Sequence, residues 1–257
     1  MSGDRDWRSV FEESYAAPPS EVAERVWRGV FGDEYPAGLD PFSYISTSEL
    51  ERFSMEVQVG EGEVVADIGC GRGGPGLWVA MATDSRLIGV DIAEHALAAA
   101  RERSRSLGLD ARAHFTRGSF DDTGIGDGEV NAVMSVDALL FAPDKTTAVR
   151  EFRRILRAGG RLVFTSWDYH RQPRGRPPQV SDHRPLLASA GFDVLAYDET
   201  EDWRRRISET SAGLLEHVTA LAAESGEPVE KVQGQLLEME ATIEAMSRRI
   251  LVVAEAH

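Results

Sequence analysis

An aspartate followed by closely spaced glycines is the part of the sequence with the clearest chemical meaning. The run VVADIGCGRGGPG (64–76) places Asp67 two residues before Gly69, and Gly69, Gly71 and Gly74 satisfy the pattern G-x-G-x-x-G. In a dinucleotide site such a turn receives a pyrophosphate through backbone N–H groups at a helix N-terminus. A carboxylate at Asp67 would repel that pyrophosphate, at a cost of up to about 4 kcal/mol for close like charges at an effective dielectric near 20. The segment therefore favours a ligand that carries positive charge and no phosphate.

S-adenosylmethionine (SAM) meets this requirement, because an α-ammonium and a sulfonium accompany its adenosine. Asp67 can hold the ammonium directly or through water, while Gly69, Gly71 and Gly73 let the backbone approach the ligand. Asp91 is the fifth residue of the run LIGVDI (87–92) and lies 20 residues after Gly71, and its carboxylate can accept hydrogen bonds from ribose hydroxyls. The same carboxylate can also cap the helix that follows, and the two roles are compatible. An acidic residue at this place serves NAD and SAM equally, so it indicates a nucleoside without choosing between them.

Alternating strands and helices position these residues. Apolar runs typical of buried strands are expected at 63–67, 86–92, 111–118, 129–136, 161–167, 192–200 and 248–257. Helical patterns lie between them at 75–82, 93–109, 144–160 and 182–192, and a glycine pair closes the third of these. This alternation implies right-handed βαβ crossovers and an α/β fold with a seven-stranded, mostly parallel, doubly wound sheet covered on both faces. Ligands of such sheets bind beyond the carboxyl ends of the strands, which is where Asp67 and the glycines lie.

Two helical regions are added to this core. Residues 4–15 and 20–29 carry apolar residues at helical spacing, with Ser20 as the expected N-cap, and residues 208–246 form a second helical pattern that breaks around 226–228. The many aromatic residues of the first region either pack its helices on the core or line a lid over an apolar substrate. The expected organisation has four parts, listed as an N-terminal helical lid (1–45), a SAM-binding core (46–207), a helical insertion that forms a substrate lid (208–246) and the last strand of the core sheet (247–257).

The composition excludes several classes of partner and site. The chain has 257 residues with 28 Lys and Arg against 43 Asp and Glu, a net charge of −15 that argues against binding nucleic acid. The segment YHRQPRGRPPQ (169–179) is the one basic patch, and its prolines favour a solvated surface loop. A single cysteine, Cys70, excludes an internal disulfide and leaves too few thiolates for a metal site.

The sequence also lacks membrane and export signals. No apolar run approaches the ~18 residues that span a bilayer, and the acidic N-terminus has no apolar region of the kind found in secretory signals. We therefore expect a cytoplasmic monomer or homodimer that acts on a small molecule, without a metal, a membrane or a nucleic acid as partner.

Five motifs in order make residues 50–167 resemble the class I SAM-dependent methyltransferases. They are VVADIGCGRG, LIGVDI, RGSFDD, NAVMSVDALLFAPD and REFRRILRAGGRLVFTSW, the last with Ala158 in place of the usual proline. Ser119 stands where an aspartate commonly receives the adenine amino group, so its hydroxyl or Asp121 would substitute. The resemblance implies a cofactor site made of Asp67, Gly69, Gly71, Gly73, Asp91, Ile92, Ser119, Phe120 and Ser135.

The catalytic apparatus is less clearly marked. Methyl transfer from a sulfonium is an in-line SN2 displacement that depends mainly on alignment, and an oxygen acceptor also needs a base within hydrogen-bond reach. Phe141 stands near the position where many small-molecule members carry a histidine. The catalytic candidates are His170, which is alternatively an exposed loop residue, and Asp137, which can instead hydrogen-bond a substrate hydroxyl. The substrate is expected to contact Tyr15, Tyr44, Phe141, Trp167 and His217, although a histidine in the position of His217 usually packs on its helix.

The resemblance implies transfer of a methyl group to an O, N or C atom of a small metabolite, as in bacterial natural-product methyltransferases. Two alternatives stay open. Some proteins of this fold bind SAM but catalyse a cyclisation or another non-methylating reaction, and a SAM-binding protein without catalysis is the third possibility. Product analysis with methyl-labelled SAM separates the three.

Overall fold

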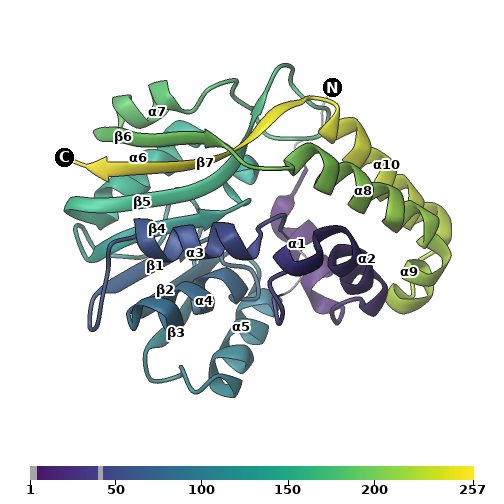
Figure 1. Cartoon of the computed structure of the whole chain (residues 1–257), viewed down its shortest axis with the longest axis horizontal. Coiled ribbons are helices and arrows are strands. Elements are labelled where there is room, and N and C mark those ends of the chain that lie inside the picture. The colour runs from purple at the N-terminus through teal and green to yellow at the C-terminus, as the bar shows by residue number, and fades with distance from the viewer. Residues whose placement is uncertain (1–4, 40–42) are drawn as a thin grey trace.

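A seven-stranded sheet forms the centre of the protein in the computed structural model, which describes residues 5–39 and 43–257 (Figure 1). Its strands are β1 (Val64–Ile68), β2 (Arg86–Asp91), β3 (Ala113–Arg117), β4 (Val130–Val136), β5 (Leu156–Tyr169), β6 (Phe192–Glu199) and β7 (Met246–Ala256). The strand order is β3-β2-β1-β4-β5-β7-β6, and β7 runs antiparallel to both of its neighbours while the other pairs are parallel. The expected seven-stranded, mostly parallel sheet is confirmed.

Ten α-helices and two short 3₁₀ segments complete the described parts of the chain. The helices are α1 (Trp7–Ala16), α2 (Glu21–Phe31), α3 (Thr47–Glu56), α4 (Gly74–Thr83), α5 (Glu94–Ser106), α6 (Lys145–Ile155), α7 (Arg184–Ser189), α8 (Trp203–Glu216), α9 (Val218–Ser225) and α10 (Val229–Ile243). The 3₁₀ segments are η1 (Gly32–Glu34) and η2 (Leu139–Phe141). The side chain of Ser20 caps α2 as expected, because it accepts a hydrogen bond from the backbone N–H of Ala23. The expected helix start at residue 4 lies outside the described residues.

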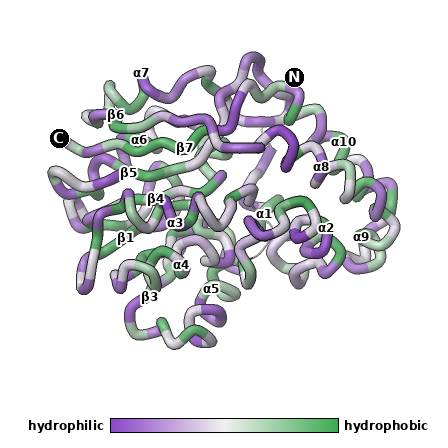
Figure 2. The backbone as a smooth tube through the Cα atoms, viewed as in Figure 1, coloured by the Kyte–Doolittle hydropathy of each residue, from purple (hydrophilic) through white to green (hydrophobic). Residues whose placement is uncertain are grey.

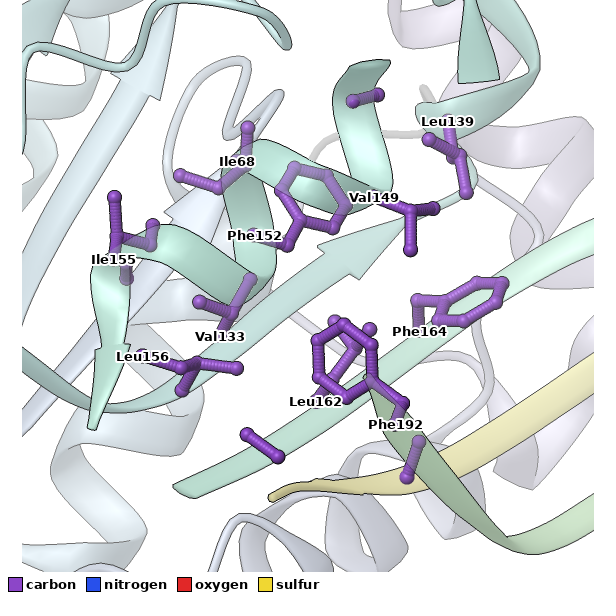
Figure 3. Close-up of a cluster of buried hydrophobic side chains, with 14 of the residues drawn as sticks. Ile68, Val133, Leu139, Val149, Phe152, Ile155, Leu156, Leu162, Phe164 and Phe192 are labelled. Carbon is purple, nitrogen blue, oxygen red and sulfur yellow. The ribbon is translucent and has the colours of Figure 1, made fainter. Parts of the chain in front are cut away.

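Helices cover both faces of the sheet. On one face, α6 places Val149, Phe152 and Ile155 against Phe164 of β5 and Ile68 of β1 (Figure 3). On the other face, α3 and α4 pack on β1, β4, β5 and β7 through a second buried cluster. Figure 2 shows hydrophobic stretches along β1 and β7, whereas α10 alternates between hydrophobic and hydrophilic residues. Complete burial of each large side chain contributes about 1.5–3 kcal/mol, so the sheet supplies a rigid frame for its carboxyl edge.

A group of helices stands beyond that edge. Figure 1 shows α1, α2, α8, α9 and α10 together at the end of the sheet opposite to the C-terminal end of β7. Because β7 runs against the parallel strands, this is the edge where β1, β2 and β4 end. Trp27 and Phe31 of α2 pack with Leu214 of α8, which joins the N-terminal helices to the helical segment before β7. Among the described residues, no helix is long and apolar enough to cross a membrane.

Two element boundaries differ from the sequence-based expectations. The helix expected over 144–160 ends at Ile155, because Leu156 already pairs with Val130 of β4 and starts β5. The glycine pair therefore lies inside the strand, where Gly160 is so close to the Asn131 carbonyl that a Cβ would approach it to 2.9 Å. The helical segment before β7 starts at Trp203 instead of residue 208, since Trp203 is buried with Trp167 and Met246. Its break at 226–228 is confirmed.

Candidate active site

A large cavity opens at the carboxyl edge of the sheet. Its volume is 1360 Å³, and it is lined by the ends of β1, β2 and β4, by residues 118–121 after β3, by α1 and by residues 172–178 after β5. Pockets that hold one drug-sized ligand typically measure about 300–1,000 Å³. The cavity therefore has room for a nucleoside cofactor and a second small molecule.

The glycine-rich turn forms the inner wall. Gly69, Gly71 and Gly73 all have positive φ (77°, 52° and 76°), which L side chains rarely adopt. A Cβ on Gly69 would lie 2.5 Å from the Cβ of Ala138, and one on Gly71 would lie 2.7 Å from the Tyr15 hydroxyl. The backbone N–H groups of Gly69 and Cys70 both donate to the Val90 carbonyl, which fixes the turn to β2. The turn is thus a narrow cradle with bare backbone on its cavity side.

Asp67 is a buried carboxylate without a partner. It is 1% exposed, no described residue forms an ion pair with it, and the one N–H group that acts on it, that of Gly76, does not make a well-formed hydrogen bond to either oxygen. Burial, reinforced by the nearby Asp91 and partly opposed by the backbone N–H of Gly76, raises the pKa of Asp67 to about 7. Asp67 lines a small adjoining cavity of 50 Å³ together with Gly71 and Tyr15. Such a group requires a cationic partner to be stable in its ionised form, and the α-ammonium of SAM has the right charge.

Asp91 is fixed at the edge of the cavity by two backbone donors. Its Oδ1 accepts from the backbone N–H of Ala93 at 2.9 Å, and its Oδ2 accepts from Gly71 at 2.8 Å. Burial raises its pKa, and the backbone donors oppose that rise. Asp91 and Ile92 line the cavity, so each carboxylate oxygen keeps a lone pair for a ribose hydroxyl.

The remaining predicted cofactor residues divide into two groups. Ser119 and Phe120 line the cavity, and the Ser119 hydroxyl donates to Asp121 Oδ1 at 2.6 Å. Ser135 and Gly73 do not line it. The Ser135 hydroxyl is buried and donates to the Ile68 carbonyl at 2.8 Å, so it holds β4 to β1 instead of contacting a ligand.

Asp137 is locked into a buried ion pair. Arg249, which is 2% exposed, donates from Nε to Oδ1 and from Nη2 to Oδ2 at 3.1 Å each, and the backbone N–H of Tyr44 donates to Oδ2 at 2.8 Å. Arg249 also donates to Glu49 Oε1 at 2.7 Å. Asp137 lines the cavity in the left-handed conformation with φ 51°, a strained backbone for a residue other than glycine. A carboxylate that already accepts three hydrogen bonds suits positioning better than proton abstraction.

Four of the predicted substrate or catalytic residues lie elsewhere. His170 is exposed at the end of β5, where its backbone N–H donates to the Ala245 carbonyl, and it does not line the cavity. His217 is exposed between α8 and α9, and its ring bonds to the Gly213 carbonyl at 2.8 Å. Tyr44 and Trp167 pack behind the cavity against α8 and α10. Sequence patterns place these residues near the correct edge but do not show which way each side chain turns.

The outer half of the cavity is lined by Phe141, by Trp7 and Phe11 of α1 and by residues 172–178. Tyr15, which was predicted with Phe141 to contact the substrate, lines the cavity next to the glycine turn. Trp7 and Phe11 belong to the aromatic residues for which the sequence left open core packing or a lid. The Phe141 ring lies 4.9 Å from the ring of Trp7 and 4.9 Å from that of Phe11. Residues 170–179 form a loop with mostly exposed or half-buried side chains, as predicted, and residues 172–178 in addition line the cavity, which was not predicted from the sequence. The high density of arginine in this segment of an acidic chain was the available signal.

A buried lysine fastens that loop to the rest of the site. Lys145 Nζ donates to the Pro178 carbonyl at 2.6 Å and to the Leu140 carbonyl at 3.3 Å. Burial lowers the pKa of Lys145 to about 8. This contact bridges the loop and η2, which carries Phe141, so two walls of the outer half are joined.

Helix α1 is held over the inner half of the cavity, next to the glycine turn, by hydrogen bonds. The Glu12 carboxylate accepts from the backbone N–H groups of Glu94 and His95 at 2.9 and 3.2 Å, which caps the N-terminus of α5. Arg72 donates to the Ala17 carbonyl at 2.6 Å and stacks over the Tyr15 ring at 5.3 Å. These contacts hold α1 over the glycine turn. No residue of 203–246 lines the cavity, so the helical insertion supports the site from behind.

Comparison with known proteins agrees with this geometry. Residues 65–160 match the family model described as a methyltransferase domain. By this domain and by its fold, the chain is similar to the class I SAM-dependent methyltransferases. The methyl donor of that family is SAM, and the orphaned Asp67 carboxylate and the bare glycine cradle of this chain fit it.

Several known proteins resemble this chain over longer stretches. Methyltransferase GfsG from Streptomyces halstedii is 31% identical over 151 residues, which cover 56% of this chain but only 54% of the relative. A sarcosine/dimethylglycine N-methyltransferase from Halorhodospira halochloris is 28% identical over 78% of this chain and 82% of its own length. Among solved structures, the [4+2]-cyclase SpnF superimposes with a TM-score of 0.71 at 19% identity, over 93% of this chain and 98% of that chain.

Proposed function

We propose that this protein transfers a methyl group from SAM to an O, N or C atom of a small molecule held in the outer half of the cavity. The observation that carries the proposal is the continuity of one 1360 Å³ cavity, which joins the glycine turn and Asp91 to an aromatic chamber formed by Trp7, Phe11 and Phe141. A shared space of this kind lets a donor and an acceptor meet.

The chain's own residues would bind and orient the cofactor. When bound, SAM supplies an electrophilic methyl group on a sulfonium. Asp67 would hold the ammonium, Asp91 the ribose hydroxyls, and Ser119 and Phe120 the adenine. Two observations support these roles. The Asp67 carboxylate lacks a partner, and Asp91, Ser119 and Phe120 line the cavity. Holding two reactants in line is itself a large part of methyl-transfer catalysis.

The substrate would be enclosed by α1 and by residues 172–178, which replace the insertion at 208–246 as the proposed lid. Asp137 is a positioning residue in this proposal. Its ion pair with Arg249 fixes the end of β4 and, through the backbone of Tyr44, the segment that follows the N-terminal helices. Since His170 lies outside the cavity, the proposed mechanism relies on alignment and uses no histidine base.

The test is incubation of the purified protein with methyl-labelled SAM and a panel of small metabolites, followed by mass spectrometry. Label in a metabolite, absent with the Asp67→Asn variant, supports methyl transfer. Conversion of a metabolite without incorporation of label supports a cyclase or another non-methylating reaction, a rival raised by the similarity in fold to SpnF. Either conversion without label or binding of SAM without any conversion contradicts the proposal.

A further inference from the structure

Three arginines of the outer cavity have no carboxylate partner. Arg8, Arg174 and Arg176 line the cavity, and none of them forms an ion pair with any described residue. In this chain acidic residues outnumber basic ones by 43 to 28, so most arginines find a carboxylate nearby. Arg5, the fourth arginine of the lining, shows the usual outcome, because it is paired with Glu238 at 2.8 Å.

Arg176 is the most informative of the three. Its guanidinium lies beside two rings that touch each other, with Cζ 5.0 Å from the centroid of Trp7 and 5.2 Å from that of Phe141. The side chain is half-buried, and its buried Nε has no hydrogen-bond partner among the described residues. Burial lowers its pKa, partly offset by Tyr169 and Glu238. A buried N–H donor of a charged group is costly when it has no acceptor, and aromatic faces compensate only part of that cost.

The carboxylates that line the cavity do not pair with these three arginines. Asp6 caps α1 through the backbone N–H of Arg8 and the Ser9 hydroxyl. Asp121 accepts from Ser119 at the cofactor end, and Asp137 is held by Arg249. The arginine side chains at the outer end therefore face the cavity with an excess of positive charge.

We infer that the methyl acceptor carries an anionic group, a carboxylate or a phosphate ester, which binds to Arg176 with Arg8 and Arg174 while its apolar body packs against the ring cluster of Trp7, Phe11 and Phe141. Guanidinium groups match carboxylate and phosphate oxygens through paired N–H donors. The inference rests on the proposed function, because it assigns the outer half of the cavity to the acceptor.

The experiment measures binding without turnover. Protein saturated with S-adenosylhomocysteine is titrated by calorimetry with 6-phenylhexanoate, 6-phenylhexyl phosphate and the neutral 6-phenylhexan-1-ol. We expect at least one anion to bind about 10- to 100-fold more tightly than the alcohol, the range for hydrogen bonds to a charged group. A preference for the carboxylate over the phosphate, or the reverse, identifies which anion the site takes.

Substitutions then identify the residues that cause the preference for an anion over the alcohol. Arg176→Gln should abolish most of it and Arg176→Lys should retain part of it, while Arg171→Gln should leave it unchanged. Arg171 is the matched control, since it belongs to the same loop but pairs with Glu244 outside the cavity. If Arg176→Gln disturbs the loop, as judged by circular dichroism, the double variant Arg8→Gln/Arg174→Gln of two exposed side chains must also reduce the preference.

Equal binding of the alcohol and both anions overturns the inference, and so does an anion preference that survives in Arg176→Gln and in the double variant. Failure here is distinguishable from failure of the proposed function. If the unsubstituted protein shows no anion preference but transfers labelled methyl, only the anionic acceptor is rejected. Absence of label transfer with a clear anion preference rejects methyl transfer and leaves an anion site.

Discussion

The two halves of the cavity are built in different ways and favour opposite charges. The inner half consists of consecutive strand ends and a glycine turn, and it presents the partnerless carboxylate of Asp67. The outer half is assembled from α1, η2 and residues 172–178, which are far apart in the chain, and it presents aromatic rings and the guanidinium of Arg176. The difference teaches that a common cofactor can be recognised largely by local backbone geometry, whereas the specific acceptor is recognised by side chains brought together only by the fold.

Removing the carboxylate of the inner half should have the largest effect. Asp67→Asn is expected to lower the affinity for SAM by about 100-fold or more, because a buried charge partner is lost. Isothermal titration calorimetry measures the affinity, and circular dichroism verifies the fold. Asp84→Asn is the control, since Asp84 is an exposed aspartate on the far end of α4. Unchanged affinity for SAM in Asp67→Asn would contradict the view that the two halves of the cavity favour opposite charges.

A ring deletion in the outer half should act on the acceptor and spare the cofactor. Trp7→Ala is expected to weaken binding of 6-phenylhexanoate about tenfold, because Trp7 contacts both Phe141 and Arg176. Affinity for SAM should change less than about threefold, since additivity holds for separate sites. The same calorimetric titrations give both numbers. An equal loss for both ligands would show that the halves act as one unit.

The pH dependence of SAM binding should reflect the ionisation of Asp67 in the inner half and no group of the outer half. The pKa of Asp67 is about 7 in the free protein, and only the ionised form attracts an ammonium. Affinity for SAM should therefore fall about tenfold per pH unit below pH 7 and level off above it. Measurements between pH 5.5 and pH 7.5 stay below the usual titration of α-amino groups near 7.7–8.0. The slope should vanish in Asp67→Asn; a slope that persists there assigns the titration to another group.

The smallest effect is expected at His170. Because this side chain is exposed outside the cavity, His170→Ala should change the rate of methyl transfer less than about twofold, the range of ordinary surface substitutions. Single-turnover assays with the acceptor identified by labelling measure this rate across pH. A loss of one limb of the pH profile would mean that the loop moves His170 into the site during catalysis.

The inner half was largely predictable from the sequence. Strand periodicity and the glycine spacing are local signals, so the places of Asp67, Gly69 and Asp91 followed from them directly. The end of α6 was not predictable, because the pairing of Leu156 with β4 overrides the helical pattern. Local propensity yields to such tertiary contacts.

The outer half was only partly predictable, since its walls meet through long-range contacts. Nothing in the local pattern around Arg176 indicates that it packs on the rings of Trp7 and Phe141. Asp137 and Arg249 are likewise separated by 112 positions, and their ion pair shows up only in three dimensions. The direction of a side chain in a loop depends on such partners. For this reason the sequence predicted a catalytic role for His170, whereas the structure places its side chain in solvent.

The glycine turn carries the chain's single cysteine, and this has a practical consequence. Cys70 is 5% exposed, and burial, with Asp91 and Asp67 nearby, raises the pKa of its thiol. Since the thiolate is the reactive form, a thiol reagent can label the native protein only when this turn opens locally. The labelling rate of one natural sulfur atom thus measures local unfolding of the turn, and ligands that close the turn should slow it in proportion to their occupancy.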